Sequence, residues 1–320
     1  MPARRCFFFS ATAALAVLLS APATAPAQRS GSDDEAIQEK VLETKDGVKL
    51  GVTYYRSSAG RDATPVIMLH DLKASRAVYR GFAERLQSPG RGSSHPSFAV
   101  VTVDFRGHGD STEQAFRGRT RQLDASNLRK ADYDAMVLGD LEAVRKLLVT
   151  ENDEGRLNLN RLSIVATGFG CSVAMNYTAR DWTMPPLAAT KQGQDVKALA
   201  LVSPRWKSSG LSLQKPLKVP ALQRSISYLM LYGGGDRKVA ADATRIFRQL
   251  ERGHRGALMV PEKTKPPETL PTLTAFGPDT ELQGQNWLQK AGSAGEDLII
   301  RFLTQHAAEP DFDYVKRRKL

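Results

Sequence analysis

Residues 162–177 read Leu-Ser-Ile-Val-Ala-Thr-Gly-Phe-Gly-Cys-Ser-Val-Ala-Met-Asn-Tyr. The first five residues are nearly all apolar, which is typical of a strand buried on both faces, and the last five favour a helix. Ala166 and Gly170 lie two positions before and after Gly168. Small residues at these two positions let the strand and helix backbones pass close together at a sharp turn. This stretch therefore predicts a strand, turn and helix centred on Gly168.

The chain on both sides of this unit alternates between strand and helix patterns. Runs at 41–44 and 48–55 flank Lys45-Asp46-Gly47, and Asp-Gly between alternating runs predicts a β-hairpin. The remaining predicted strands are 66–70, 98–103, 196–202, 226–232 and 256–260, and the predicted helices are 79–86, 131–149, 240–250 and 292–305, the last after a Pro/Thr-rich connection. This order predicts an α/β fold: a mostly parallel sheet with helices on both faces.

Two segments before Gly168 carry a family pattern. His70-Asp71 follows a buried strand, and Asp104-Phe105-Arg106-Gly107-His108-Gly109-Asp110-Ser111 follows the next one. Together with the turn at Gly168, they resemble the α/β-hydrolase superfamily over about residues 37–306. The resemblance implies the α/β-hydrolase fold, with residues 104–111 shaping the loop after the fourth strand. His108 is accordingly expected to be a packed loop histidine and not a catalytic base.

The resemblance also assigns the positions of a catalytic triad. The nucleophile position falls on Gly168, the acid on Asp236, and the base on Gln283, in the loop before the last helix. Glycine has no side chain that could attack a carbonyl, and a glutamine amide cannot take up a proton near neutral pH. Two of the three triad roles are therefore predicted to be vacant. Glycine does keep the positive φ of the turn at low cost.

The oxyanion hole implied by the resemblance consists of main-chain N–H groups, those of Leu72 and Phe169. Asp71 stands where the family usually has glycine. Its carboxylate is expected beside the hole, where it would oppose the negative charge that develops during acyl transfer.

Ser172 and Cys171 are alternative nucleophiles. Ser172 fits a G-x-S-x-A pattern but lies one helical turn beyond Gly168. Cys171 lies near a helix N-terminus, which favours a thiolate, although a buried core cysteine is the main expectation. His254 lies between positive charges and is expected at the surface, and His95 and His306 do not have the position of a triad base.

The N-terminus predicts export. Arg4-Arg5, the apolar run 6–19 and Ala25-Pro26-Ala27 indicate a signal peptide over residues 1–27, the alternative being a retained anchor. A flexible lead-in is expected at 28–36. Loss of Arg4 and Arg5 would lower the formal charge from +11 to +9 and leave Cys171 as the one cysteine, so stability must come from the core.

Two further segments are assigned from the sequence. Residues 204–223 are expected to form a reduced lid, and 307–320 a basic tail. The run Lys316–Lys319 is expected to be solvated and frayed, the alternative being weak contact with anionic envelope polymers or lipid headgroups. No nucleic-acid module, cofactor fingerprint or metal-ligand cluster is recognised.

Three functions fit these patterns. The leading hypothesis is an exported, catalytically degenerate hydrolase that binds a small molecule or a protein in the former active-site crevice. The second is an active serine- or cysteine-type ester or acyl hydrolase with non-standard residues. The third is a basic, envelope-associated scaffold.

Overall fold

The computed structural model describes residues 1, 35–185, 187, 190–260 and 264–318. The predicted signal peptide after Met1 and all but two residues of the predicted lead-in lie outside this part of the chain. Among the described residues, no helix has the length and apolar character needed to cross a membrane.

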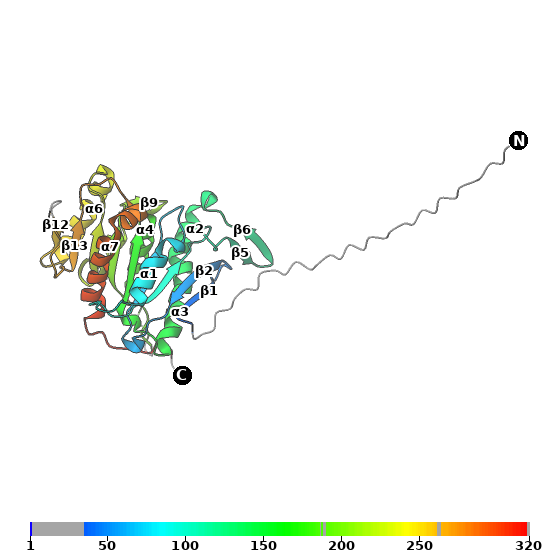
Figure 1. Cartoon of the computed structure of the whole chain (residues 1–320), viewed down its shortest axis with the longest axis horizontal. Coiled ribbons are helices and arrows are strands. Elements are labelled where there is room, and N and C mark those ends of the chain that lie inside the picture. The colour runs from blue at the N-terminus through cyan, green and yellow to red at the C-terminus, as the bar shows by residue number, and fades with distance from the viewer. Residues whose placement is uncertain (2–34, 186, 188–189, 261–263, 319–320) are drawn as a thin grey trace. The chain divides into compact units, whose positions relative to one another are not determined.

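A nine-stranded sheet runs through the domain in the order β1-β2-β4-β3-β7-β8-β11-β13-β12 (Figure 1). β1 and β2 form an antiparallel hairpin, β2 is antiparallel to β4, and all further neighbours are parallel. The strands are β1 Ile37–Glu43, β2 Lys49–Tyr55, β3 Pro65–Leu69, β4 Ala99–Val103, β7 Leu162–Thr167, β8 Val196–Val202, β11 Ser227–Leu231, β12 Leu258–Val260 and β13 Leu273–Phe276. The predicted mostly parallel sheet and its N-terminal hairpin are confirmed.

Helices cover both faces of the sheet. The side chains of β3 alternate, so that Ile67 packs with α3 and α4 while Met68 packs with α1 and α7. The five main helices are α1 Arg80–Gln87, α3 Leu141–Asp153, α4 Phe169–Thr183, α6 Arg237–Leu250 and α7 Gly284–Leu303. The sheet core is thus divided into two apolar clusters, one on each face.

Two elements near the C-terminus differ from prediction. The expected last strand is only an edge strand, β12, and β13 inserts between it and β11. β13 falls in the predicted Pro/Thr-rich connection, yet its first three residues are fully buried, which explains why they form a parallel strand. The terminal helix begins at Gly284 and not at 292, directly after Gln283, which has an extended conformation.

The predicted helix 131–149 is divided into α2 (Lys130–Ala135), a π-helical turn (Met136–Asp140) and α3. Asp140, at the end of the wider turn, is fully buried and pairs with Arg106 at 2.5 Å. A short hairpin was not predicted, β5 (Glu113–Phe116) with β6 (Arg119–Gln122). Positive φ angles at Arg117 and Gly118 are typical of the tight turn that closes such hairpins.

The segment predicted as a reduced lid is packed into the domain. It forms two short strands, β9 (Lys207–Ser208) and β10 (Leu211–Ser212), and the short helix α5 (Pro220–Arg224). These elements contact α4 and α6. The leucines of the segment that are buried in the same cluster as α4 are Leu211, Leu213, Leu217 and Leu222.

The C-terminal segment, expected to be solvated and frayed, is instead hydrogen-bonded to the domain. Asn158 Nδ2 donates to the Phe312 carbonyl at 2.6 Å, and Asn152 Nδ2 donates to the Val315 carbonyl at 3.0 Å. The Asp153 carboxylate accepts the main-chain N–H groups of residues 317 and 318 at 2.7 and 3.0 Å. The expectation for the run Lys316–Lys319 is therefore wrong for Arg317, which is buried; Lys316 and Arg318 are exposed, and Lys319 lies outside the described residues.

A buried charge explains this docking. Asp195 precedes β8, and its fully buried carboxylate pairs with Arg145 at 3.2 Å and with Arg317 at 2.7 Å. Asp181, at the end of α4, accepts the N–H groups of Asp195 and Val196 at 2.7 and 3.0 Å. Burial, and secondly the charge of Asp195, raise the pKa of Asp181 to about 6. We call Arg145, Asp181, Asp195 and Arg317 the amino-edge cluster, because they lie where the parallel strands begin.

Candidate functional site

The turn at Gly168 has the geometry of a nucleophile elbow. β7 ends at Thr167, α4 begins at Phe169, and Gly168 between them has φ 50° and ψ −115°. This positive φ is strained for residues other than glycine. Gly170 packs so tightly that a Cβ there would lie 2.5 Å from the Leu69 carbonyl oxygen. The predicted strand, turn and helix are thus all present.

The Asp71 carboxylate binds the two main-chain N–H groups that are predicted to form an oxyanion hole. Its Oδ1 accepts the main-chain N–H of Leu72 at 2.8 Å and that of Phe169 at 2.7 Å. These are the two donors that the family resemblance assigns to the hole. A Cβ built on Gly168 would lie 2.0 Å from Asp71 Oδ2. The same carboxylate therefore also takes up the space of a nucleophile's side chain.

The sequence predicts the Asp71 carboxylate beside the hole, whereas in the structure it is bonded to both N–H groups. The two N–H groups that would stabilise a tetrahedral oxyanion already bind a resident anion. The Phe169 ring packs edge-on against Phe105 and Tyr133, with ring centres 5.7 and 5.4 Å apart. The turn is thus held by the Asp71 carboxylate at the Phe169 N–H and by aromatic packing at the Phe169 ring.

The Gln283 side chain, at the base position, ties two loops together. Its Oε1 accepts from Ser203 Oγ at 2.6 Å, and its Nε2 donates to the Gly233 carbonyl at 2.8 Å. Ser203 Oγ in turn accepts the Gly284 N–H at 2.7 Å. Ser203 follows β8 and was not singled out from the sequence, because its partner lies 80 residues away. A Cβ on Gly284 would lie 3.2 Å from Asp71 Oδ2, so this corner is next to the elbow.

Asp236, at the acid position, caps a helix. Its Oδ1 accepts the N–H groups of Lys238 and Val239 at 2.9 and 3.1 Å, the pattern of an N-cap residue. In the part of the chain that the structure describes, it makes no hydrogen bond with Gln283. The three triad positions are therefore near one edge of the sheet but are not connected as a triad.

The segment 104–111 has the loop-shaping role that the resemblance implies. Asp104 accepts the Arg76 N–H at 2.6 Å and the Asp110 N–H at 3.0 Å, and it also pairs with the Arg76 guanidinium. A Cβ on Gly109 would lie 2.2 Å from Asp104 Oδ2, so this position requires glycine. His108 is buried, with Nδ1 3.1 Å from the Arg106 carbonyl oxygen, in agreement with a packed loop histidine.

His70 holds the main chain that carries Asp71. Its Nε2 accepts the Phe105 N–H at 3.1 Å, which leaves Nδ1 as the donor to the Asp71 carbonyl at 2.7 Å. Burial lowers the pKa of His70 to about 4, so the ring is neutral at pH 7. His70 therefore positions the loop of Asp71 and adds no positive charge beside its carboxylate.

The alternative nucleophiles lie in the interior. Ser172 is fully buried, and no described residue hydrogen-bonds its hydroxyl. The Cys171 thiol is fully buried 3.3 Å from the Ala166 carbonyl oxygen. Burial, and secondly the charge of Asp71, raise the pKa of this thiol well above its ordinary value, which disfavours a thiolate.

His254 is buried, so its expected surface position is wrong. Its Nδ1 lies 3.0 Å from Thr272 Oγ1, and its ring packs edge-on against Tyr228. Gly253 approaches the Gln223 carbonyl so closely that a Cβ would lie 1.7 Å from it, and this contact draws His254 inward. No cluster of three or more His, Cys, Asp or Glu side chains suited to a metal ion occurs among the described residues.

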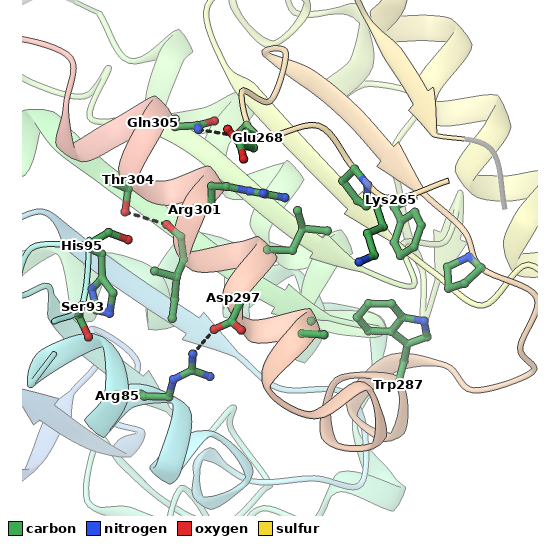
Figure 2. A pocket seen from close by; sticks show the side chains of 18 of the residues that line it. Arg85, Ser93, His95, Lys265, Glu268, Trp287, Asp297, Arg301, Thr304 and Gln305 are labelled. Atoms are coloured by element: carbon green, nitrogen blue, oxygen red, sulfur yellow. Dashed lines mark hydrogen bonds and ion pairs between the residues drawn. The ribbon is translucent and has the colours of Figure 1, made fainter. Parts of the chain in front are cut away.

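A separate cavity of about 1440 Å³ lies on the outer side of α7 (Figure 2). Its walls are formed by α7, the end of α1, and the loops 90–95, 264–268 and 278–282. Asp71 and Gly168 are not among its lining residues. The sequence predicts ligand binding at the strand ends and gives no signal for this cavity, because its wall segments lie far apart in the sequence.

No protein-family model and no curated protein matches this chain. Its structure is similar to the esterase Pf2001 of Pyrococcus furiosus, with a TM-score of 0.56 and 14% identity over 85% of this chain and 93% of that one. Weaker similarity is found to a dienelactone hydrolase of Anabaena variabilis, with a TM-score of 0.48 and 14% identity over 85% of this chain and 100% of that one. The chain therefore has the α/β-hydrolase fold, and identity this low carries no information on activity.

Proposed function

We propose, from the premise that the chain has the α/β-hydrolase fold, that it is an exported pseudo-hydrolase that acts by binding. The observation that carries this proposal is the position of the Asp71 carboxylate, bonded to the N–H groups of Leu72 and Phe169 and lying against Gly168. It adds a third obstacle to the vacant nucleophile and base positions. The proposed export rests on the N-terminal sequence alone.

The expected losses in reaction rate favour an inactive site. Loss of the serine or histidine of a triad lowers the rate by about 10⁶, and loss of one oxyanion-hole donor lowers it by roughly 10²–10³. Here both side chains are replaced and both donors are occupied. The rival hypothesis is a hydrolase that uses Ser172 or Cys171. Both side chains are fully buried, which argues against attack on a substrate by either. Contact of the exposed Lys316 and Arg318 with anionic envelope surfaces stays a prediction.

Reconstruction of the site tests this proposal. The wild-type protein is expected to hydrolyse p-nitrophenyl esters no faster than the solvent background. Gly168→Ser with Gln283→His is expected to be equally inactive, because Asp71 still fills the hole. The triple variant with Asp71→Gly in addition should recover saturable turnover, roughly 10²-fold or more above that double variant, since one recovered donor alone has this value. Asp71→Gly alone, the matched control, should stay inactive.

A fluorophosphonate probe provides a second readout, because it labels only an activated serine. Labelling is expected in the triple variant alone. Saturable ester turnover by the wild-type protein that a serine-directed inhibitor abolishes would show that an unrecognised nucleophile is active, and the proposal would fail.

A further inference from the structure

The cavity beside α7 has an apolar wall formed by the edge of the hydrophobic core. Leu298 and Ile300 line the cavity, together with Trp287 from the start of the same helix. All three side chains are buried and belong to the apolar cluster on this face of the sheet. Helix α7 therefore contributes core side chains to the wall of this space.

The opposite wall continues this surface. Phe276, at the end of β13, and Leu282, next to Gln283, are half-buried and line the cavity. Leu282 belongs to the loop that carries the base in active relatives of this fold, and the Gln283 side chain fixes that loop to Gly233. The cavity thus includes a residue of the loop that carries Gln283, but Asp71 and Gly168 do not line it.

The charges of the cavity are unevenly compensated. Arg85 pairs with both Glu296 and Asp297. Arg301 is half-buried, its Nε is enclosed, and no described residue accepts a hydrogen bond from it or forms an ion pair with it. In Figure 2 the side chains of Arg301, Lys265 and Trp287 converge on the same space. A guanidinium that is partly removed from water and has no anionic partner among the described residues is electrostatically incomplete.

Carboxylates at the rim do not fill this role. Glu268 and Glu309 line the cavity but are exposed, and neither forms an ion pair with Arg301 in the part of the chain described. Asp297 is already held by Arg85. Lys265 and Lys290, both exposed and without a carboxylate partner among the described residues, add positive charge at the rim.

We propose that this cavity binds an amphipathic anion: an apolar chain or ring system that bears one carboxylate or phosphate. The anionic group pairs with Arg301, and the apolar body lies against Trp287, Leu298 and Phe276. A volume of about 1440 Å³ is above the usual range for small-ligand sites, roughly 300–1,000 Å³, and accommodates a long acyl chain. The inference rests on the proposed function, since it names the site and ligand class of a binding protein.

Trp287 allows a direct test, because bromine quenches tryptophan fluorescence on contact. The wild-type protein is titrated with 12-bromododecanoate, with the corresponding monoalkyl phosphate and with the uncharged bromo-alcohol, each below its micellar concentration. Saturable quenching by at least one anion is expected, and the stronger of the two identifies carboxylate or phosphate. Trp287→Phe should abolish the response, because Trp182 and Trp206 do not line the cavity.

Arg301→Gln tests the charge. Loss of a charge-assisted hydrogen bond should raise the anion's Kd roughly 10- to 100-fold and leave that of the alcohol unchanged. Arg248→Gln, which removes an exposed arginine from α6 without an ion partner among the described residues, is the matched control and should change neither value. Circular dichroism and the melting temperature establish that both variants are folded.

The proposal is overturned if anion and alcohol bind equally, if Arg301→Gln leaves the anion's Kd unchanged, or if quenching persists in Trp287→Phe. Ester turnover is measured on the same wild-type preparation. Turnover there would defeat the proposed function, whereas absent quenching with absent turnover would defeat only this site.

Discussion

The two edges of the parallel sheet hold carboxylates in opposite ways, Asp71 being half-buried and Asp195 fully buried. At the carboxyl edge, Asp71 is bound by two main-chain N–H groups, and no described cation pairs with it. At the amino edge, Asp195 is bound by the side chains of Arg145 and Arg317. Both carboxylates have partners, which are main-chain N–H groups at Asp71 and guanidinium side chains at Asp195.

This difference distinguishes an anion site made by the main chain from one made by particular side chains. Main-chain donors belong to the fold, so the N–H groups of Leu72 and Phe169 can hold an anion whatever side chain stands at position 168. The amino-edge cluster depends on particular side chains, one of them three residues from the C-terminus. We therefore expect substitutions at the carboxyl edge to alter chemistry, and those at the amino edge to alter mainly stability.

The largest effect on stability is expected at Arg317. Arg317→Ala leaves the buried Asp195 short of one cation, and breaking a buried ion pair costs about 3–5 kcal/mol. Urea unfolding measures the loss. Arg318→Ala removes the same charge from an exposed neighbour and should change the free energy of unfolding by less than about 0.5 kcal/mol. Equal losses in both variants would mean that the tail does not stabilise the cluster.

A smaller, pH-dependent effect is expected at Asp181. Its pKa is about 6 in the folded protein and about 3.9 when unfolded, so between these values the folded state binds more protons. The free energy of unfolding should therefore fall as pH rises from 4 to 6, by up to about 3 kcal/mol from this group.

Asp181→Asn should remove that slope, because its amide oxygen can still accept the N–H groups of Asp195 and Val196 but does not titrate. Urea unfolding at pH 4, 5, 6 and 7 compares the two proteins. If the free energies of unfolding of both proteins change with pH in parallel, the pKa of Asp181 is not raised and its carboxylate is not buried at this edge.

Local patterns predicted most of the fold. The Asp-Gly hairpin, the continuous apolar strands and the glycine at 168 each follow from a few neighbouring residues. The sequence did not predict β13, because a segment of three buried residues among prolines is too short to show periodicity. The sequence also did not predict that the C-terminal segment docks. A basic run near a terminus gives no sign of the buried carboxylate at position 195, which lies 122 residues before Arg317.

The sequence predicts positions for the candidate site but not the contacts of its side chains. The vacant nucleophile and base positions at Gly168 and Gln283 stay predictions from the family resemblance. That the Asp71 carboxylate lies in the hole depends on its rotamer and on two strands meeting side by side, which no local pattern records. The cavity beside Arg301 has the same limitation, because its walls come from distant segments.

The central claim, that the Asp71 carboxylate fills the space of a nucleophile, is tested most directly by a double-mutant cycle. Free energies of unfolding are measured for the wild-type protein, Gly168→Ser, Asp71→Gly and the combination. The account predicts that Gly168→Ser costs about 2 kcal/mol more with Asp71 present than without it, because a Cβ at 168 would expel the carboxylate from its two N–H donors. An equal cost in both backgrounds would contradict it.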